Sequence, residues 1–491
     1  MKNQPNIILF FTDQLRQDAL GCYGNEICQT PNLDRLASEG VIFNQAYTTS
    51  PVCSPSRASL MSGQYPHNHG VMVNTHIAPA WTGGLDENKI TFSSLLKDRG
   101  YTLDYLGKWH VNQNLSPKHF GFDQYNDGDG SSYWIQKMNK KKLGSERWIE
   151  FPRGKWLASA CADYIKENDY TWALTDGLIS TIEDRCNQNK PFFIRMDTPA
   201  PHHPNVVPEP YANMYDPESI PPWENFVETF EDKPAGHLRK HTEWNLMEKD
   251  WNWWSEVVAK YYGDVTLIDD CVGRVLNTIK NKGLEENTIF IFSTDHGDAL
   301  GSHKHFEKAG TMYDEIFKIP LIIRGPSSFI KSRLSNEFVR LMDLMPTIID
   351  WAGGELPSNL DAISMIKLLS GDISPIWPDS VYAEHHGEVW GYQTQRMVRT
   401  LNWKYVFCPH DLDELYNLRN DPYEMRNLIN DSKQKEILDE MRARLIGWND
   451  ATNDMFQWDW VRWNFPEPIL PKYFKNKSVP DRKDMERTLR K

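Results

Sequence analysis

The stretch "NIILFFTD", residues 6–13, is a run of apolar side chains that ends on an aspartate. Apolar runs of this length are typical of strands buried on both faces, and such strands usually belong to parallel sheets. Four further runs share the pattern: residues 101–110, 191–204, 288–298 and 319–326. Between them, apolar residues from Val258 to Ile279 recur at three- and four-residue steps and precede Gly283, which predicts a helix that ends at a glycine. Alternating strands and helices predict an α/β sandwich with a large, mostly parallel central sheet flanked by helices.

The character of the sequence changes near residue 375. Residues 1–375 are predicted to form the catalytic α/β domain. From residue 376 to residue 491, short β-like pieces, a turn and a helix predict a smaller antiparallel α+β subdomain with a Trp-rich tail. Residues 205–256 are rich in proline, tryptophan and charge, and they are predicted to form a long insertion near the active site, because long ordered insertions often wall a substrate site.

Composition and charge narrow the class of protein. The chain has 491 residues, of which 40% are hydrophobic and 25% charged, as is typical of a folded globular protein. The net charge of −13 argues against nucleic acid as a partner, whereas a local basic pocket can still bind an anionic substrate. The seven cysteines include no CxxC pair and indicate neither a disulfide framework nor a thiolate zinc site. No apolar run is long enough for a signal peptide or a membrane segment, so we expect no membrane partner and a cytoplasmic location, unless a signal peptide has been removed.

Polar side chains follow the predicted strands at the point where each strand ends. In open α/β sheets ligands bind beyond the carboxyl ends of the strands, so these side chains are predicted to meet at one site. They are Asp13, Gln14, Lys108, His110, His202, His203, Asp295 and His296. Asp13 and Asp295 are predicted to share a divalent cation, which would neutralise two carboxylates that otherwise repel each other. Oxygen ligands favour Ca²⁺ or Mg²⁺, and His296 leaves Mn²⁺ or Zn²⁺ open.

Cys53 lies in the stretch "SPVCSPSRASLMSG", residues 50–63. Ser54 as N-cap and Pro55 as the first helical residue would place this thiol at the mouth of a helix. It is either a buried structural cysteine or a nucleophile precursor, since a helix N-terminus lowers a thiol pKa and stabilises an adjacent anion. Arg57 and Lys308 add positive charge to the site. A metal ion, these cations and histidines around one nucleophile suit the hydrolysis of a tetrahedral oxyanion ester.

The segment "CSPSRASLMSG" resembles the signature of the type I sulfatases, the formylglycine-dependent branch of the alkaline phosphatase superfamily. Further segments resemble sulfatase segments in the family's order over nearly the whole chain: "NIILFFTDQLRQDALGCYG", "TPNLDRLASEGVIFNQAY", "GKWH", "PAPHHP", "STDHGDALGSHK" and "ELYNLRNDPYEMRNL". The resemblance implies an alkaline-phosphatase-like fold and a sulfuric ester hydrolase.

The resemblance also implies the nature of the nucleophile and of the metal site. Cys53 would be oxidised to Cα-formylglycine by a formylglycine-generating or radical sulfatase-maturating enzyme. One hydroxyl of the hydrated aldehyde would attack sulfur, and the second would let the intermediate collapse with release of sulfate. Asp13, Asp295 and His296 would hold Ca²⁺ together with the formylglycine oxygen, and Gln14 would reach the metal through its amide oxygen.

The remaining catalytic roles follow from the same resemblance. Arg57 would stabilise the hydrate. Lys108 and His110 would bind the hydrate and the sulfate, with His110 as the base in the collapse. His202 and Lys308 would contact the sulfate and assist the leaving oxygen.

Two residue pairs depart from the pattern of many sulfatases, which have Asp-Asp and Asp-Asn where this chain has Asp13-Gln14 and Asp295-His296. The same pairs occur in phosphonate monoester hydrolases and choline sulfatases of the superfamily, so a phosphonate monoester or phosphodiester hydrolase stays open as an alternative. Those relatives usually lack the tryptophan of GKWH, which favours a sulfatase. An inactive glycan-binding relative that keeps its thiol is a third hypothesis.

The expected substrate is a sulfated carbohydrate or a small aryl or alkyl sulfate. The high aromatic content favours a carbohydrate, because aromatic rings stack on sugar faces. Candidate contacts on the substrate side are His203, which is also the fallback for His202, and His385, His386 and Trp390.

Overall fold

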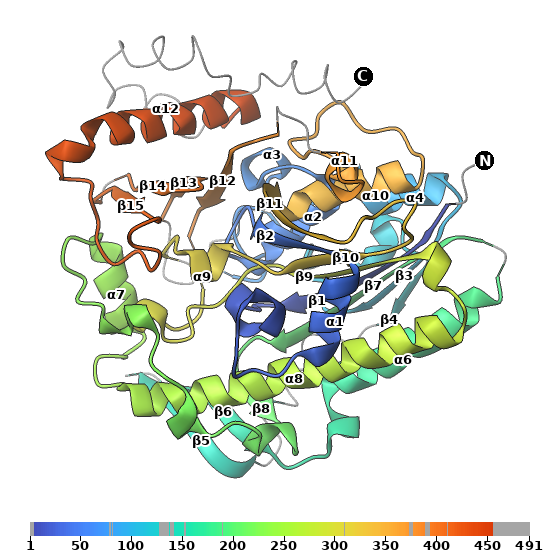
Figure 1. The fold of residues 1–491 in the computed structure, drawn as a ribbon, viewed down its shortest axis with the longest axis horizontal. Helices are drawn as coiled ribbons and strands as arrows, with labels where there is room; N and C mark the ends of the chain where they lie inside the picture. Colours follow the sequence, from blue (N-terminus) through green and yellow to red (C-terminus); the bar gives the residue numbers. More distant parts are fainter. Residues whose placement is uncertain are drawn as a thin grey trace.

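The computed structural model describes residues 4–77, 80, 82–126, 137, 142–151, 154–188, 190–308, 310–372, 377–387, 393–409 and 411–454. Its centre is an eight-stranded sheet (Figure 1). In spatial order the strands are β11 (Arg333–Arg340), β2 (Val41–Tyr47), β10 (Leu321–Arg324), β9 (Thr288–Thr294), β1 (Asn6–Asp13), β7 (Phe192–Pro201), β3 (Thr102–Gly107) and β4 (Gln124–Asn126). Only β10 is antiparallel to its neighbours in this sheet. The predicted mostly parallel sheet is confirmed.

Helices cover both faces of the central sheet, as Figure 1 shows. In β1, Ile8 and Phe10 pack into one buried cluster while Ile7, Leu9 and Phe11 pack into another, because successive side chains of a strand point to opposite faces. One face carries α1 (Pro31–Glu39), α6 (Tyr170–Cys186) and α8 (Trp251–Asn281). The other carries α2 (Cys53–Ser62), α4 (Phe92–Asp98), α10 (Leu344–Trp351) and α11 (Ile366–Leu369). Burial on both faces explains why the strands read as continuous apolar runs.

Helix α8 contains the predicted helical pattern and extends beyond it. Gly283 follows its end with φ of 67°, and the Gly283 amide donates to the carbonyl of Lys280. The helix already begins at Trp251, so residues 251–256 belong to it and not to the irregular segment that the sequence predicted. Its N-cap, Asp250, explains the early start, because the carboxylate accepts from the Trp253 amide. The preceding segment holds β8 (Asn205–Val207), short 3₁₀ helices and α7 (Ala235–Glu243).

The C-terminal part forms a separate antiparallel sheet, as predicted. Its strands are β12 (Ser380–His385), β13 (Gln395–Thr400), β14 (Trp403–Phe407) and β15 (Glu414–Asn417), and α12 (Lys435–Thr452) packs on it. The division of the chain at residue 375 stays a prediction. The Trp-rich tail extends into residues 455–491, which lie outside the described residues.

A third sheet was missed by the sequence analysis. It consists of β5 (Lys142–Phe151), β6 (Gly154–Ala162) and β8. Charged residues interrupt β5, so its sequence shows neither a continuous apolar run nor clear alternation. Two further short helices are α3 (Pro66–His69), which follows α2, and α9 (Asp314–Phe317), which follows β9. None of the helices in the described part of the chain is long and apolar enough to cross a membrane.

Candidate active site

Strand register brings the predicted polar residues to one edge of the central sheet. Thr12 of β1 pairs with Thr294 of β9, so the aspartates that follow them, Asp13 and Asp295, leave the sheet side by side. On the other side of β1, the register of β7 and β3 places Gly107 beside Asp197, which brings Lys108 to the same edge. The carboxyl ends of these parallel strands therefore form the site, as expected for an open α/β sheet.

Cys53 reaches this edge from the N-terminus of α2. The helix begins at Cys53, with Val52 as the N-cap residue, so the predicted start at Pro55 with a Ser54 cap is wrong. Tertiary contacts replace the cap, because the Ser54 amide donates to the Asn74 side chain and the Ser54 hydroxyl accepts from the Thr75 amide. The thiol thus lies in the first turn of the helix, where unpaired backbone N–H groups favour an adjacent anion.

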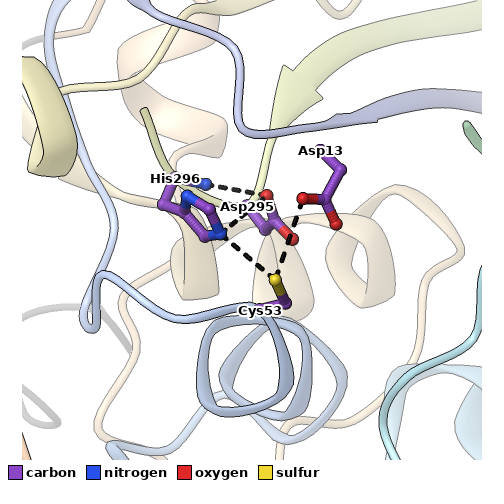
Figure 2. Close-up of side chains that lie close together, drawn as sticks. All are labelled: Asp13, Cys53, Asp295 and His296. Carbon is purple, nitrogen blue, oxygen red and sulfur yellow. Dashed lines mark hydrogen bonds and ion pairs between the residues drawn. The ribbon is translucent and has the colours of Figure 1, made fainter. Parts of the chain in front are cut away.

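Four buried side chains converge at this point (Figure 2): Asp13, Cys53, Asp295 and His296. One potential ligand atom from each lies within 4.8 Å of all the others. The Cys53 sulfur is 3.3 Å from Nε2 of His296 and 3.7 Å from the Asp13 carboxylate. Two carboxylates, an imidazole and the atom at position 53 form a donor set that suits a divalent cation.

The tautomer of His296 suits a metal ligand. Its Nδ1 atom lies 2.9 Å from the carbonyl of Gly297 and must donate to it, so Nε2 carries a lone pair and faces the group. Burial lowers the pKa of His296, which keeps the ring neutral.

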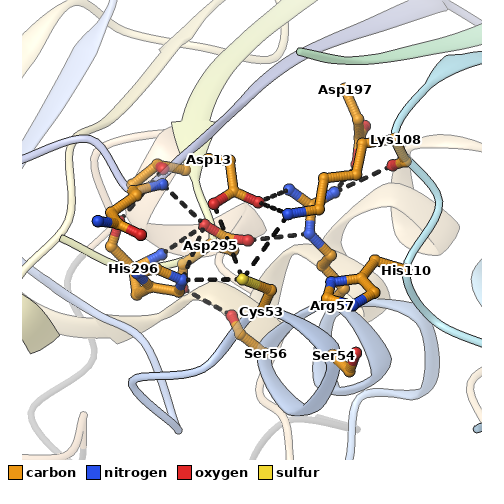
Figure 3. A network of polar contacts seen from close by, with 12 residues as sticks. Asp13, Cys53, Ser54, Ser56, Arg57, Lys108, His110, Asp197, Asp295 and His296 are labelled. Atoms are coloured by element: carbon orange, nitrogen blue, oxygen red, sulfur yellow. Dashed lines mark hydrogen bonds and ion pairs between the residues drawn. The ribbon is translucent and has the colours of Figure 1, made fainter. Parts of the chain in front are cut away.

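A cationic clamp surrounds the same carboxylates (Figure 3). The Arg57 guanidinium donates to Asp13 at 2.8 Å, to Asp295 at 2.9 Å and to Asp197 at 2.6 Å. The Lys108 ammonium lies 2.6 Å from the Asp13 carboxylate. Burial alone would raise the pKa of Asp13, but Lys108 and Arg57 outweigh it and hold that pKa well below its usual range. Buried cations of the protein therefore already offset part of the negative charge of Asp13 and Asp295, and the shared divalent cation stays a prediction.

The Cys53 thiol is not activated as a thiolate. Burial, together with the negative charge of Asp13, raises the pKa of this thiol to about 12. Desolvation and the neighbouring carboxylate thus outweigh the lowering of a thiol pKa that a helix N-terminus favours. Position 53 therefore offers a neutral thiol in an anion-stabilising place.

A second group of side chains centres on Lys308. Its ammonium lies 2.5 Å from Nε2 of His202 and 2.7 Å from the amide oxygen of Gln14. The Nδ1 atom of His202 donates to the carbonyl of His203, so Nε2 is the acceptor for Lys308. The Gln14 amide nitrogen donates to Asp298 at 2.7 Å. The Gln14 amide thus bridges Lys308 and Asp298, and its role as a metal ligand stays a prediction.

The predicted substrate-side residues lie in different surroundings. His203 is buried 2.8 Å from Asp298 and packs on Phe306, so His202 is the histidine of this pair that reaches Lys308. His385 is buried and accepts from the Gly310 amide, two residues beyond Lys308. His386 lies 3.4 Å from Glu384. Trp390 lies outside the described residues.

Two polar residues of the site were not selected from the sequence. Asp197 lies within β7, where it bridges Arg57 and Arg195 and accepts from the Tyr105 hydroxyl. His76 lies 2.8 Å from Nε2 of His110. A charged pair inside an apolar strand, "RMD", was a visible signal for Asp197, whereas no local pattern marks His76.

Family models and relatives agree with this architecture. A model of the sulfatase family matches residues 5–354, and a model described as N-sulphoglucosamine sulphohydrolase, C-terminal, matches residues 301–451. An uncharacterized sulfatase of Escherichia coli (strain K12) is 30% identical, covering 94% of this chain and 90% of the relative. An arylsulfatase of Clostridium perfringens is 29% identical (90% and 94% covered), and an N-acetylglucosamine-6-O-sulfatase of Bacteroides thetaiotaomicron is 28% identical (92% and 88% covered).

Solved structures show the same fold. A phosphonate monoester hydrolase of Agrobacterium radiobacter has a TM-score of 0.76 at 23% identity, with 91% of this chain and 96% of that chain covered. A 2-O GAG sulfatase has a TM-score of 0.72 at 26% identity, with 92% and 94% covered. The fold and the edge at which its polar residues gather define an alkaline-phosphatase-like hydrolase. The chain belongs to the sulfatase family, which is the class of enzyme that its sequence predicts.

Proposed function

We propose that the chain hydrolyses sulfate monoesters at the group formed by Cys53, Asp13, Asp295 and His296. The observation that carries this proposal is the convergence of these buried side chains with Arg57 and Lys108 at the N-terminus of α2. Such a site combines a nucleophile position with fixed positive charge, which is what the transfer of an anionic sulfuryl group requires.

The donor set fits a divalent cation, for which we propose Ca²⁺, with Mg²⁺ or Mn²⁺ as substitutes. Asp13, Asp295 and the bare Nε2 of His296 would hold it together with the group at position 53. We further propose that a maturating enzyme converts Cys53 to formylglycine, in line with the neutral, unactivated thiol. The cation would supply charge neutralisation and the hydrated aldehyde a nucleophilic hydroxyl.

The chain's own residues would orient the substrate and move protons. Lys108 lies 3.8 Å from the Cys53 sulfur and would bind a sulfate oxygen at that position. Lys308 would donate a proton to the leaving oxygen, with His202 accepting one of its hydrogen bonds and thereby orienting it. Burial and Lys108 lower the pKa of His110 well below its usual value, so its neutral ring would serve as the base. Arg57 would hold the two metal-binding carboxylates in place.

A sulfated carbohydrate is the substrate class we propose. The N-acetylglucosamine-6-O-sulfatase relative, whose match covers 92% of this chain, supports this choice. His385, next to the Lys308 loop, and His203, His386 and Trp390 stay candidate contacts on the substrate side.

A phosphonate monoester or phosphodiester hydrolase is the second candidate. Gln14 and His296 favour it, because phosphonate hydrolases of the superfamily share these residue types. The tryptophan of the GKWH segment, Trp109, favours the sulfatase, because those phosphonate hydrolases usually lack it. In the inactive glycan-binding relative, the thiol of Cys53 would persist.

A comparison of esters of one phenol tests the proposal. We expect the matured protein to hydrolyse nitrophenyl sulfate at least about tenfold faster, in kcat/KM, than the matching phosphonate monoester, and Cys53→Ala to abolish both activities while leaving the thermal melt unchanged. Faster phosphonate hydrolysis would establish the second candidate. Turnover by Cys53→Ala above a host-enzyme control would contradict the role of position 53. Sulfated monosaccharides, beginning with N-acetylglucosamine 6-sulfate, then test the substrate class.

A further inference from the structure

His110 and His76 form a hydrogen-bonded pair at the rim of the site. Nδ1 of His76 and Nε2 of His110 lie 2.8 Å apart, and the ring centroids are 4.9 Å apart. His76 is exposed, whereas Nδ1 of His110 is buried and has no hydrogen-bond partner among the residues that the structure describes. In a pair of neutral imidazoles one ring donates and the other accepts, so the tautomers of the two histidines are coupled.

The charges around His110 decide which ring donates. Nε2 is turned to His76, and Nδ1, the other ring nitrogen, is buried. Figure 3 draws the His110 ring with Arg57 and Lys108. The groups that act on this ring are Lys108, Arg57, Asp13 and His76. A lone pair is more stable than an N–H group in a field dominated by an ammonium and a guanidinium. His110 therefore carries its proton on Nε2 and donates it to His76.

His76 is suited to accept that proton. Partial desolvation of its ring, together with the positive charges of Lys108 and Lys308, lowers the pKa of His76, so the ring stays neutral and its Nδ1 keeps a lone pair. The backbone of His110 adopts φ of 53°, in the left-handed region just after β3, so no regular element sets the orientation of its ring. The hydrogen bond to His76 provides that orientation.

We propose that His76 is a positioning residue, which accepts the Nε2 proton of His110 and thereby holds Nδ1 of His110 as a bare base that faces the reacting group. This inference rests on the role proposed above for His110. As base in the collapse, Nδ1 would take the proton that the second hydroxyl of the hydrate at position 53 gives up as sulfate leaves, and the resulting imidazolium would keep its Nε2–H group bonded to His76. Nδ1 then returns its proton to water as the product leaves, and His76 keeps its own proton on Nε2 throughout.

Two substitutions separate positioning from proton relay. His76→Asn keeps a hydrogen-bond acceptor, its amide oxygen, close to the position of Nδ1, whereas His76→Leu fills the space without an acceptor. We expect His76→Leu to lower kcat on nitrophenyl sulfate by about 10- to 100-fold with KM within about twofold, and His76→Asn to stay within about threefold of wild type. The matched control is His119→Leu, because His119 is exposed and its side chain bonds to Ser116 within its own turn; this variant should retain wild-type kcat. Equal losses in both His76 variants, or wild-type kcat in His76→Leu, would overturn the proposal.

The tautomer of His110 can be measured without turnover. In protein labelled with nitrogen-15 histidine, the ring shifts of His110, assigned by comparison with His110→Gln, should report an Nε2–H tautomer in wild type and His76→Asn and a mixture in His76→Leu. An Nδ1–H tautomer in wild type would overturn the proposal. If wild type shows the expected tautomer but matured protein does not cleave sulfate esters, the proposed function fails while the positioning of His110 by His76 stands.

Discussion

Asp197 orders the site although it is neither a predicted metal ligand nor a predicted substrate contact. Its carboxylate accepts from Arg57, from Arg195 at two positions and from the hydroxyl of Tyr105, and all four side chains are buried. Arg57 in turn fixes Asp13 and Asp295. Asp197 therefore orients the two carboxylates of the four-residue group through a shared guanidinium.

Replacing Asp197 by asparagine should distinguish this buried, orienting carboxylate from a carboxylate in an exposed ion pair. Asp197→Asn leaves Arg195 buried without its counter-charge, so we expect a loss of about 3–5 kcal/mol in the free energy of unfolding and at least about a tenfold loss of kcat. Urea denaturation and steady-state turnover measure the two effects. Asp379→Asn is the control, because Asp379 is 72% exposed beside Arg444 and should cost no more than about 1 kcal/mol. Equal, small losses in both variants would contradict the account.

The residues of the site were predictable to the extent that they follow strands. Asp13, Lys108, His202 and Asp295 could be selected because buried parallel strands are apolar and end at one edge. Asp197 was marked only by the charged pair "RMD" inside an apolar strand, and its partners are set by strand pairing. His76 has no local signal, because it meets His110 only in the folded chain. The raised pKa of the Cys53 thiol could not be predicted, because a local helix argument ignores desolvation.

Strand β3 ends on a glycine that lets Lys108 enter the site. Gly107 has φ of 89°, and a Cβ atom there would lie 2.1 Å from the carbonyl oxygen of Asp197. The neighbouring Lys108 amide donates to that same carbonyl at 2.9 Å. The close approach of β3 to β7 thus requires a residue without a side chain.

Gly107→Ala should therefore damage both the sheet edge and catalysis. Gly100→Ala is the matched control, because Gly100 also has a positive φ, of 83°, but no atom of the described residues, apart from its chain neighbours, lies within 4 Å of the added Cβ. Backbone conformation alone should cost Gly100→Ala about 1–2 kcal/mol with activity retained. We expect a larger loss of stability in Gly107→Ala, together with a loss of kcat as Lys108 shifts. Thermal melts and turnover measure both effects. Equal melting temperatures and equal turnover in Gly107→Ala and Gly100→Ala would contradict this account.

Helices and strands were predictable where burial gives their sequence a continuous apolar run or a periodic apolar pattern. The five apolar runs correspond to β1, β3, β7, β9 and β10, and helix α8 follows its three- and four-residue pattern. The sheet of β5, β6 and β8 leaves no such trace, because charged residues interrupt β5 and β8 is only three residues long. The orientation of β10 also escaped prediction, since an apolar run does not distinguish a parallel strand from an antiparallel one inside a sheet.

At the scale of the whole molecule, His67 links the catalytic part of the chain to the C-terminal sheet and its helix α12. It lies on α3, directly after the α2 segment, and its Nδ1 is 2.8 Å from Glu384 on β12. Its Nε2 lies 3.1 Å from the Thr452 carbonyl at the end of α12. Burial opposes charge on this ring, but Glu384 outweighs it and raises the pKa of His67 to about 9. Both nitrogens then donate, which ties the C-terminal sheet to the catalytic part.

This linkage predicts a pH dependence of stability. Because the pKa of His67 is higher in the folded than in the unfolded protein, its contribution is complete below about pH 6.5 and is lost as pH rises through about 9. Between these values the free energy of unfolding of wild type should fall by about 1–3 kcal/mol more than that of His67→Gln. Urea denaturation at pH 6.5 and 9.5 measures the difference. Parallel pH profiles of the two proteins would show that His67 does not carry this charge.

The overall architecture was the most predictable level, since the order of apolar runs and the change of character near residue 375 are properties of the whole sequence. The contacts between the sheets were not predictable, because His67, Glu384 and Arg396 meet only in the folded chain.

The central claim is that residue 53, once oxidised, is the nucleophile of a sulfatase. The most direct test is peptide mass spectrometry across Cys53 on preparations made with increasing amounts of maturating enzyme, with sulfatase turnover measured on each preparation. We predict that turnover rises in proportion to the fraction of peptide carrying the aldehyde and vanishes when every peptide carries the thiol. Full turnover in protein whose Cys53 is entirely thiol would contradict the account.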